Sequence, residues 1–69
     1  MLHYWYMVTL KRLRLRKLLS QDRLAKLSGV SRTTVVAIEN NQHKPQPLTI
    51  QKLANALGVD PSEIDDHDT

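Results

Sequence analysis

Residues 21–40, QDRLAKLSGVSRTTVVAIEN, hold the most informative pattern in this 69-residue chain. Ser20 and Ser31 each stand immediately before a helical run, where a hydroxyl can accept hydrogen bonds from the free N–H groups of the first turn. Gly29 lies between the two runs, and glycine adopts the left-handed conformation that ends many helices at little steric cost. The pattern therefore predicts two short helices joined by a sharp turn.

The two expected helices, 21–28 and 32–40, have the pattern of a helix-turn-helix. Ala25 is small where two helices would cross, and Val35 and Ile38 are apolar at a spacing that buries one side of the second helix. A small residue, a glycine and buried aliphatics in this order are typical of a helix-turn-helix, whose second helix enters the major groove of DNA. The centre of the chain is therefore predicted to bind DNA.

The helix expected at 32–40 has one face suited to the major groove. A helical wheel places Arg32, a long cation, on this face among short neutral side chains. An arginine can form two hydrogen bonds with a guanine, a threonine can contact a base edge, and a valine or alanine can contact a thymine methyl group. The expected base-contacting residues are therefore Arg32, Thr33, Val36 and Ala37.

Three further helices are expected around this motif. The first covers about residues 9–18, with Thr9 as its N-cap and a strongly basic surface. Another begins at a proline and covers 47–57, where an apolar stripe ends at Gly58. A short fifth helix is expected around Ile64, because DPSEI at 60–64 combines an N-capping aspartate, a proline at the first helical position and a glutamate at the third. The sequence thus predicts an all-α fold, a compact five-helix bundle.

Length and composition exclude several classes of protein. A chain of 69 residues makes one domain with a modest core and leaves little room for a deep enzyme cleft. There is no cysteine for disulfides or thiolate metal sites, and no apolar run is long enough to span a membrane. The apolar stretch at the start precedes the basic residues, the reverse of a signal peptide. A cytoplasmic protein is therefore expected.

The histidines offer no catalytic or metal-binding arrangement. His3, His43 and His67 are scattered along the chain and share no helix face. We therefore expect no enzymatic activity, no metal site and no cofactor.

Charge is distributed unevenly along the chain. Residues 1–59 contain all ten basic residues and two acidic ones, a balance of +8, whereas residues 60–69 contain five acidic residues. A basic body with an acidic end fits a polyanionic partner such as DNA. By itself, the charge fits an ordinary soluble domain equally well.

Residues 1–8, MLHYWYMV, contain all three aromatic residues of the chain. Aromatic and β-branched residues in a row favour an extended segment. Tyr4, Trp5 and Tyr6 are therefore candidates for a clasp that pairs with a second subunit or covers an apolar patch. The alternatives are a loosely docked terminus and a native start at Met7.

Four segments together resemble a known family: LKRLR at 10–14, LSQDRLAKLSGVSRTTVVAIEN at 19–40, KPQPLTIQKLANALGV at 44–59 and DPSEI at 60–64. The chain resembles the Cro/repressor-type helix-turn-helix domains, the XRE-like family of phage and bacterial regulators. The resemblance implies a fold like that of the lambda repressor DNA-binding domain.

The resemblance also implies roles for individual residues. Arg14 would pair with Glu39, bracing the first helix against the end of the base-contacting helix, and a bidentate pair would neutralise the carboxylate beside DNA. The alternative is that Arg14 contacts phosphate and Glu39 is solvated. Gln21 would contact phosphate or buttress the base-contacting helix. The expected phosphate-binding residues are Gln21, Asn40, Asn41, Gln42 and Lys44.

Two features depart from the family pattern. Leu18 stands near the end of the first helix, where a glycine or another small or polar residue is common, so either the turn is altered or an apolar contact is added. Val36 and Ala37 replace polar side chains that are often found there, so recognition would depend more on methyl contacts and DNA shape.

The expected domains are the aromatic extension at 1–8, a helix-turn-helix domain at 9–66 and an acidic tail at 67–69. The predicted function is a homodimeric, sequence-specific transcriptional regulator of double-stranded DNA, a repressor. The alternative is an antitoxin-type module that neutralises a partner toxin through one of its ends and represses its own operon. RNA binding ranks third, because the aromatic residues lie away from the basic helix.

Overall fold

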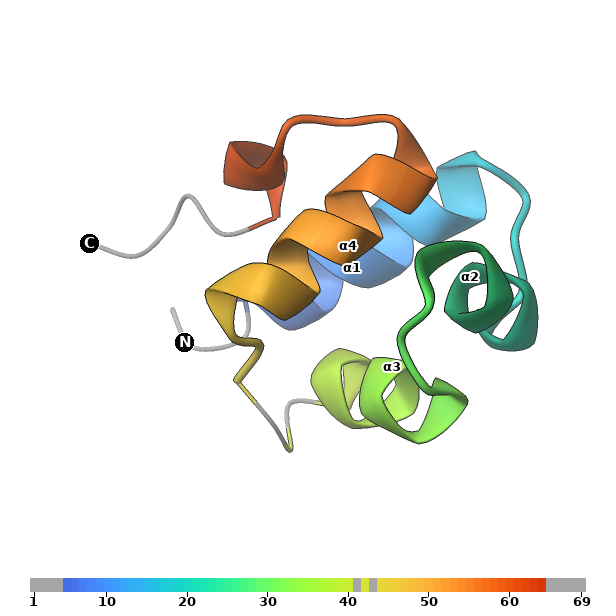
Figure 1. Cartoon of the computed structure of the whole chain (residues 1–69), viewed down its shortest axis with the longest axis horizontal. Coiled ribbons are helices and arrows are strands. Elements are labelled where there is room, and N and C mark those ends of the chain that lie inside the picture. The colour runs from blue at the N-terminus through green and yellow to red at the C-terminus, as the bar shows by residue number, and fades with distance from the viewer. Residues whose placement is uncertain (1–4, 41, 43, 65–69) are drawn as a thin grey trace.

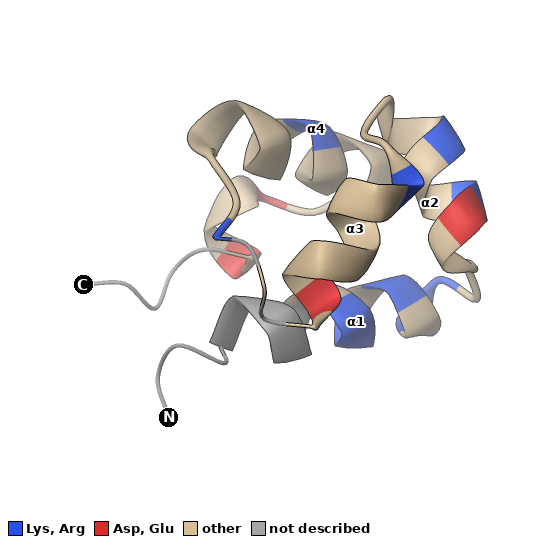
Figure 2. Ribbon diagram, turned by 90° about the horizontal axis from the view of Figure 1, so that it is seen from below, with Lys and Arg blue, Asp and Glu red and all other residues tan. Residues whose placement is uncertain are grey.

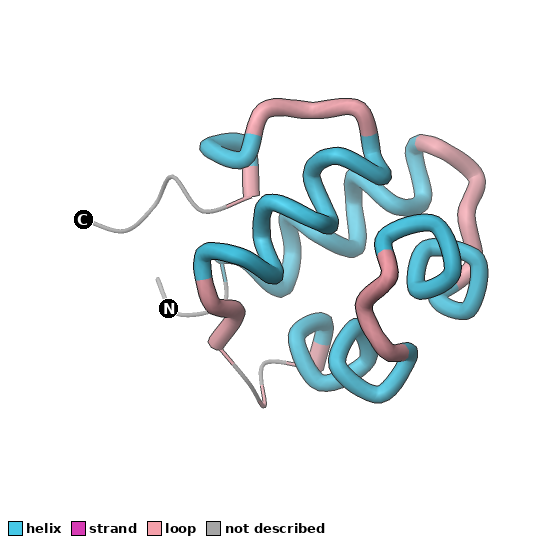
Figure 3. Tube along the Cα trace, viewed as in Figure 1, coloured by secondary structure: helices cyan, strands magenta, loops and turns pink. Residues whose placement is uncertain are grey.

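Four α-helices and a short 3-10 helix make up the part of the chain that is described by the computed structural model, namely residues 5–40, 42 and 44–64 (Figures 1 and 3). Side chains are described from Leu10 onward. In chain order the elements are α1 (Trp5–Arg16), α2 (Gln21–Ser28), α3 (Arg32–Glu39), α4 (Pro47–Leu57) and the 3-10 helix η2 (Pro61–Glu63).

One aliphatic core joins these elements. The helix α3 packs against α1 and α2, while α4 packs against α2 and η2. Full burial of a leucine or isoleucine side chain contributes about 1.5–3 kcal/mol, so these contacts are the main source of stability. The buried core residues are Leu10, Leu13, Leu24, Ala25, Val30, Val35, Ile38, Ile50, Leu53, Ala54, Leu57 and Ile64.

The caps predicted for the two central helices are confirmed. The Oγ atom of Ser20 accepts a hydrogen bond of 3.0 Å from the backbone N–H of Arg23, and that of Ser31 accepts one of 3.1 Å from Thr34. Gly29 follows α2 in the left-handed conformation, with φ 75°. Local sequence chemistry therefore sets both starts and the turn between them.

The helix α1 differs from the prediction at both ends. It begins at Trp5, so Thr9 lies inside the helix and residues 5–8 are not extended; it ends at Arg16. Residues 5–16 contain no glycine or proline. An aromatic or β-branched residue disfavours a helix by less than about 0.7 kcal/mol, and a helix that has already nucleated extends easily. The predicted clasp lies outside the described side chains and stays a prediction.

The expected short fifth helix is a single 3-10 turn, η2, and not a further α-helix. Hydrogen bonds link residues three apart, from the N–H of Glu63 to the carbonyl of Asp60 at 2.9 Å and from Ile64 to Pro61 at 3.0 Å. Such a turn uses the few bonds that a short segment can form, and it buries Ile64 against the core. The bundle therefore has four α-helices and one 3-10 turn in the described part of the chain.

The capping residues of this turn lie as the sequence indicated. The N–H of Ser62 donates to Oδ1 of Asp60 at 3.0 Å, and the N–H of Asp60 donates to Oε2 of Glu63 at 3.3 Å. The hydrogen bond from the backbone N–H of Ser62, assisted by the Ser62 hydroxyl, lowers the pKa of Asp60 below its ordinary value of 3.8.

The turn between α1 and α2 passes through Leu18 in a left-handed conformation. Its φ is 58°, and it is the one non-glycine residue with positive φ in the described part of the chain. Its side chain is 92% exposed. The apolar contact considered for this residue is therefore not made with the side chains that the structure describes, and the left-handed backbone accounts for the glycine that is common at this position.

Candidate nucleic-acid interface

The four residues predicted to contact bases lie together on the outer face of α3. Arg32 and Thr33 are exposed, and Val36 and Ala37 are half-buried. The opposite face of α3 is held in the core by side chains that are fully buried. Figure 2 shows α3 at the front of the molecule, with basic residues on the elements around it.

The buried pair at the end of α3 is formed by Arg14 and Glu39. The Nε atom of Arg14 donates to Oε2 of Glu39 at 2.7 Å, and Nη2 donates to Oε1 at 2.9 Å. The two side chains are 8% and 2% exposed. This bidentate geometry neutralises the carboxylate at the end of α3 and fixes α3 against α1.

Two further hydrogen bonds extend the pair to α2. The Nη1 atom of Arg14 donates to the carbonyl oxygen of Leu19 at 2.8 Å, in the turn that leads into α2. The Nε2 atom of Gln21 donates to Oε1 of Glu39 at 3.0 Å. Gln21 therefore buttresses α3, one of the two roles that the resemblance implied. The sequence carried no direct signal for either bond, because both depend on how α1, α2 and α3 pack.

The expected phosphate-binding residues after α3 are mostly exposed. Asn40 caps the helix, its N–H donating to the carbonyl of Val36 at 2.9 Å, and Gln42 donates its N–H to Ala37 at 2.8 Å. Lys44 is also exposed. Asn41 lies outside the described residues.

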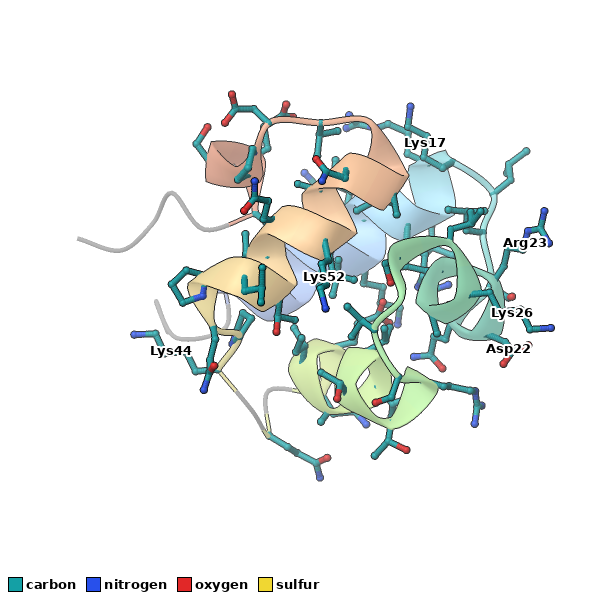
Figure 4. The ribbon with its side chains drawn as sticks, viewed as in Figure 1. Lys17, Asp22, Arg23, Lys26, Lys44 and Lys52 are labelled. Carbon is teal, nitrogen blue, oxygen red and sulfur yellow. The ribbon has the colours of Figure 1, made fainter. Side chains whose placement is uncertain are left out.

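Basic side chains flank α3 on two sides. In Figure 4, Lys44 lies on one side of α3, and Arg23 and Lys26 lie on the other. Lys26 is 3.8 Å from Asp22 of the same helix, and both side chains are largely exposed. A surface pair of this kind stabilises a protein by less than about 1 kcal/mol, so it does not hold Lys26 away from a phosphate. Neither Arg23 nor Lys26 was among the residues predicted from sequence.

The described residues contain no metal-binding cluster of three or more His, Cys, Asp or Glu side chains. His3, His43 and His67 lie outside them. In the same part of the chain, no helix combines the length and the apolar character that crossing a membrane requires.

A family model for helix-turn-helix domains matches residues 10–64. The chain belongs to the HTH_3 helix-turn-helix family. This membership confirms the resemblance to XRE-like regulators, which are DNA-binding transcriptional regulators rather than enzymes. The matched residues include all four α-helices, the first in part, and η2.

Two solved structures are similar to this HTH_3 domain. The restriction-modification controller protein C.AhdI from Aeromonas hydrophila is 39% identical, with a TM-score of 0.86, over 90% of this chain and 94% of that one. An HTH_3 family transcriptional regulator from Vibrio cholerae is 32% identical, with a TM-score of 0.86, over 96% of this chain. This chain covers 37% of the length of the Vibrio protein. No curated protein matches the sequence.

Proposed function

We propose that this HTH_3 protein is a homodimeric repressor that binds a specific duplex DNA sequence through the major groove with α3. The observation that carries the proposal is the exposed face of α3, which offers Arg32 and Thr33 to a partner while the opposite face is fixed in the core. A helix held in this way can enter the groove without reorganising, and such rigidity favours specific contacts.

The first turn and the centre of α3 supply the proposed base contacts. Arg32 stands in the first turn, where its guanidinium can donate two hydrogen bonds to the O6 and N7 atoms of guanine. Thr33, beside it, supplies a hydroxyl and a methyl group to the next base edge. Val36 and Ala37 follow at the centre of the helix.

Phosphate groups would be bound on both sides of α3. The N-terminus of α2 has free N–H groups and the positive end of a helix dipole. The amide of Gln21 has two N–H groups, and one of them can reach a phosphate while the other donates to Glu39. Beyond α3, the proposed phosphate contacts are Asn40, Asn41, Gln42 and Lys44.

Dimerisation follows from the size of the domain and from the geometry of reading DNA. One α3 spans only a few base pairs, so two copies would contact half-sites about one helical turn apart, about 34–36 Å. The aromatic residues Tyr4, Trp5 and Tyr6 are the proposed clasp between the copies. Similarity to C.AhdI, a controller of restriction-modification, supports a role in gene control.

Selection from a random duplex pool at near-physiological salt tests the proposal. The expected result is a two-fold symmetric motif whose half-site spacing matches one helical turn. Retention of DNA without enrichment of any motif would contradict sequence-specific binding. It would mean that the basic surface binds DNA only as a polyanion, and it would favour a function whose main partner is a protein.

Two variants then separate base contacts from phosphate contacts. Arg32→Ala should weaken binding of the selected sequence by about 1–3 kcal/mol and relax the preference at one base position. Lys44→Ala should weaken the binding of all DNA sequences alike. It should also reduce the slope of the logarithm of the binding constant against the logarithm of the salt concentration by about one. An unchanged base preference in Arg32→Ala would assign base reading to another element.

A further inference from the structure

The centre of the exposed face of α3 is apolar. Val35 and Ile38 are fully buried, but Val36 and Ala37 between them are only half-buried and present methyl groups to solvent. In Figure 2 the ribbon of α3 is blue in its first turn and red in its last, and tan throughout the middle. The middle of the helix therefore offers methyl surface and no charge.

The polar side chains of α3 do not offer hydrogen bonds to DNA at this apolar centre, because two of them already form hydrogen bonds within the protein. The hydroxyl of Thr34 accepts a hydrogen bond of 2.8 Å from Ser31, and Glu39 accepts three from Arg14 and Gln21. Hydrogen-bonding side chains that face outward lie at the two ends of the helix only. They are Arg32 and Thr33 at the start, and Asn40 at the end.

The major groove has one apolar group that fits such a centre. Hydrogen-bond donors and acceptors line the base edges, and the exception is the methyl group on C5 of thymine. Placing methyl surface against donors and acceptors would leave them without partners, which is unfavourable. An apolar patch at the centre of a groove-binding helix thus favours a pyrimidine that has a C5 methyl group.

We infer that Val36 and Ala37 determine specificity by contacting pyrimidine C5 methyl groups at the centre of each half-site. This inference rests on the proposed function, because it assumes that α3 lies in the major groove. It adds the chemical class of the central bases: thymine, or cytosine methylated at C5, with Arg32 selecting a guanine beside them. Binding should therefore respond to one methyl group on the DNA.

Substitution of deoxyuridine for thymine tests the inference. Each thymine of the selected duplex is replaced in turn, which removes a methyl group and keeps the base pair and its hydrogen bonds. At each contacted thymine we expect the dissociation constant to rise about fourfold, the effect of one buried methyl-sized group.

Protein variants identify the residue that makes the contact. In Val36→Ala the penalty for deoxyuridine should fall toward none at one thymine, and Val36→Thr, which keeps the shape of the side chain, should reduce it as well. The matched control is Asn55→Ala. Asn55 is exposed and belongs to the last turn of α4, and that turn lies across the molecule from α3 (Figure 1). It should keep the full penalty. Circular dichroism checks that all three variants are folded.

The outcomes separate the two proposals. Specific binding that is insensitive to deoxyuridine at every thymine would overturn the methyl inference and leave the proposed function intact. An undiminished penalty in Val36→Ala and Val36→Thr would also overturn it, since the methyl group would then be contacted elsewhere. A pool with no enriched motif would refute both.

Discussion

The chain turns through a left-handed residue on each side of α2, and the two turns are stabilised differently. After α2 the residue is Gly29, with φ 75°, and a Cβ placed there would meet no atom within 4 Å. Before α2 it is Leu18, with φ 58°. For a residue with a Cβ this conformation costs about 1–2 kcal/mol.

A distant contact offsets the cost at the first turn. Arg14 donates to the carbonyl of Leu19, directly after the left-handed residue, and is itself held by Glu39 from α3. The second turn needs no such contact, because glycine makes the conformation accessible. A sharp turn can thus be encoded by the residue at the turn or by a buried pair far along the sequence.

The largest expected effect comes from breaking that pair. Glu39→Ala leaves the guanidinium of Arg14 buried without its partner, so the free energy of unfolding should fall by about 3–5 kcal/mol in urea denaturation. The control is the double variant Arg14→Met with Glu39→Leu, which buries no charge and should recover much of the loss. A loss below about 1 kcal/mol for Glu39→Ala would mean that the pair does not stabilise the first turn.

Gly29→Ala should destabilise the second turn by about 1–2 kcal/mol. The penalty comes from the backbone alone, because the added methyl group has open space around it. The measurement is again urea denaturation, with Lys26→Ala on the surface of α2 as the control, expected to change stability by less than about 0.5 kcal/mol. Equal effects for the two variants would contradict the importance of the left-handed conformation.

Leu18→Gly should have the opposite sign and raise the free energy of unfolding by about 0.5–1 kcal/mol. Relief of the left-handed strain exceeds the entropy that glycine adds to the unfolded chain, but not by much. Leu18→Ala keeps the strain and removes only an exposed side chain, so it should be nearly neutral. Destabilisation of the protein by Leu18→Gly would show that the leucine side chain makes a stabilising contact.

The smallest effect concerns the turn after α4, where the capping group can be titrated. The folded-state pKa of Asp60 lies below 3.8, so its contribution to stability is present above that value and is lost as the pH falls through the folded pKa. Asp60→Asn keeps an acceptor for Ser62 but does not titrate. Thermal melts at several pH values should show a slightly weaker acid dependence for the variant; an identical dependence would rule out the cap as its source.

Local signals predicted the centre of the molecule well. Ser20, Gly29 and Ser31 determined the limits of α2 and the start of α3, because each acts on the backbone within three or four residues. The start of α1 was not predictable in the same way. Residues 5–8, which precede the expected N-cap Thr9, contain no glycine or proline that would keep the helix from extending through them. The short helix after Asp60 was expected from its capping pattern, but its 3-10 form was not predictable, because the same pattern fits an α-helix equally well.

The candidate site was predictable to the extent that it depends on helix periodicity. The outward positions of Arg32 and Val36 follow from the wheel, whereas the pair of Arg14 with Glu39 came from the family resemblance. The hydrogen bond from Gln21 to that pair joins residues 18 positions apart and depends on how α2 and α3 cross. No local pattern encodes such a bond.

The two faces of α3 have different evolutionary freedom. The side chains of Arg32, Thr33 and Val36 take no part in the caps of α3 or in the buried pair, so most replacements there leave the fold intact. Val35, Ile38 and Glu39 are buried and constrained. Descendants of this protein could therefore acquire new DNA targets through single substitutions, while selection for a folded domain acts on the opposite side of the same helix.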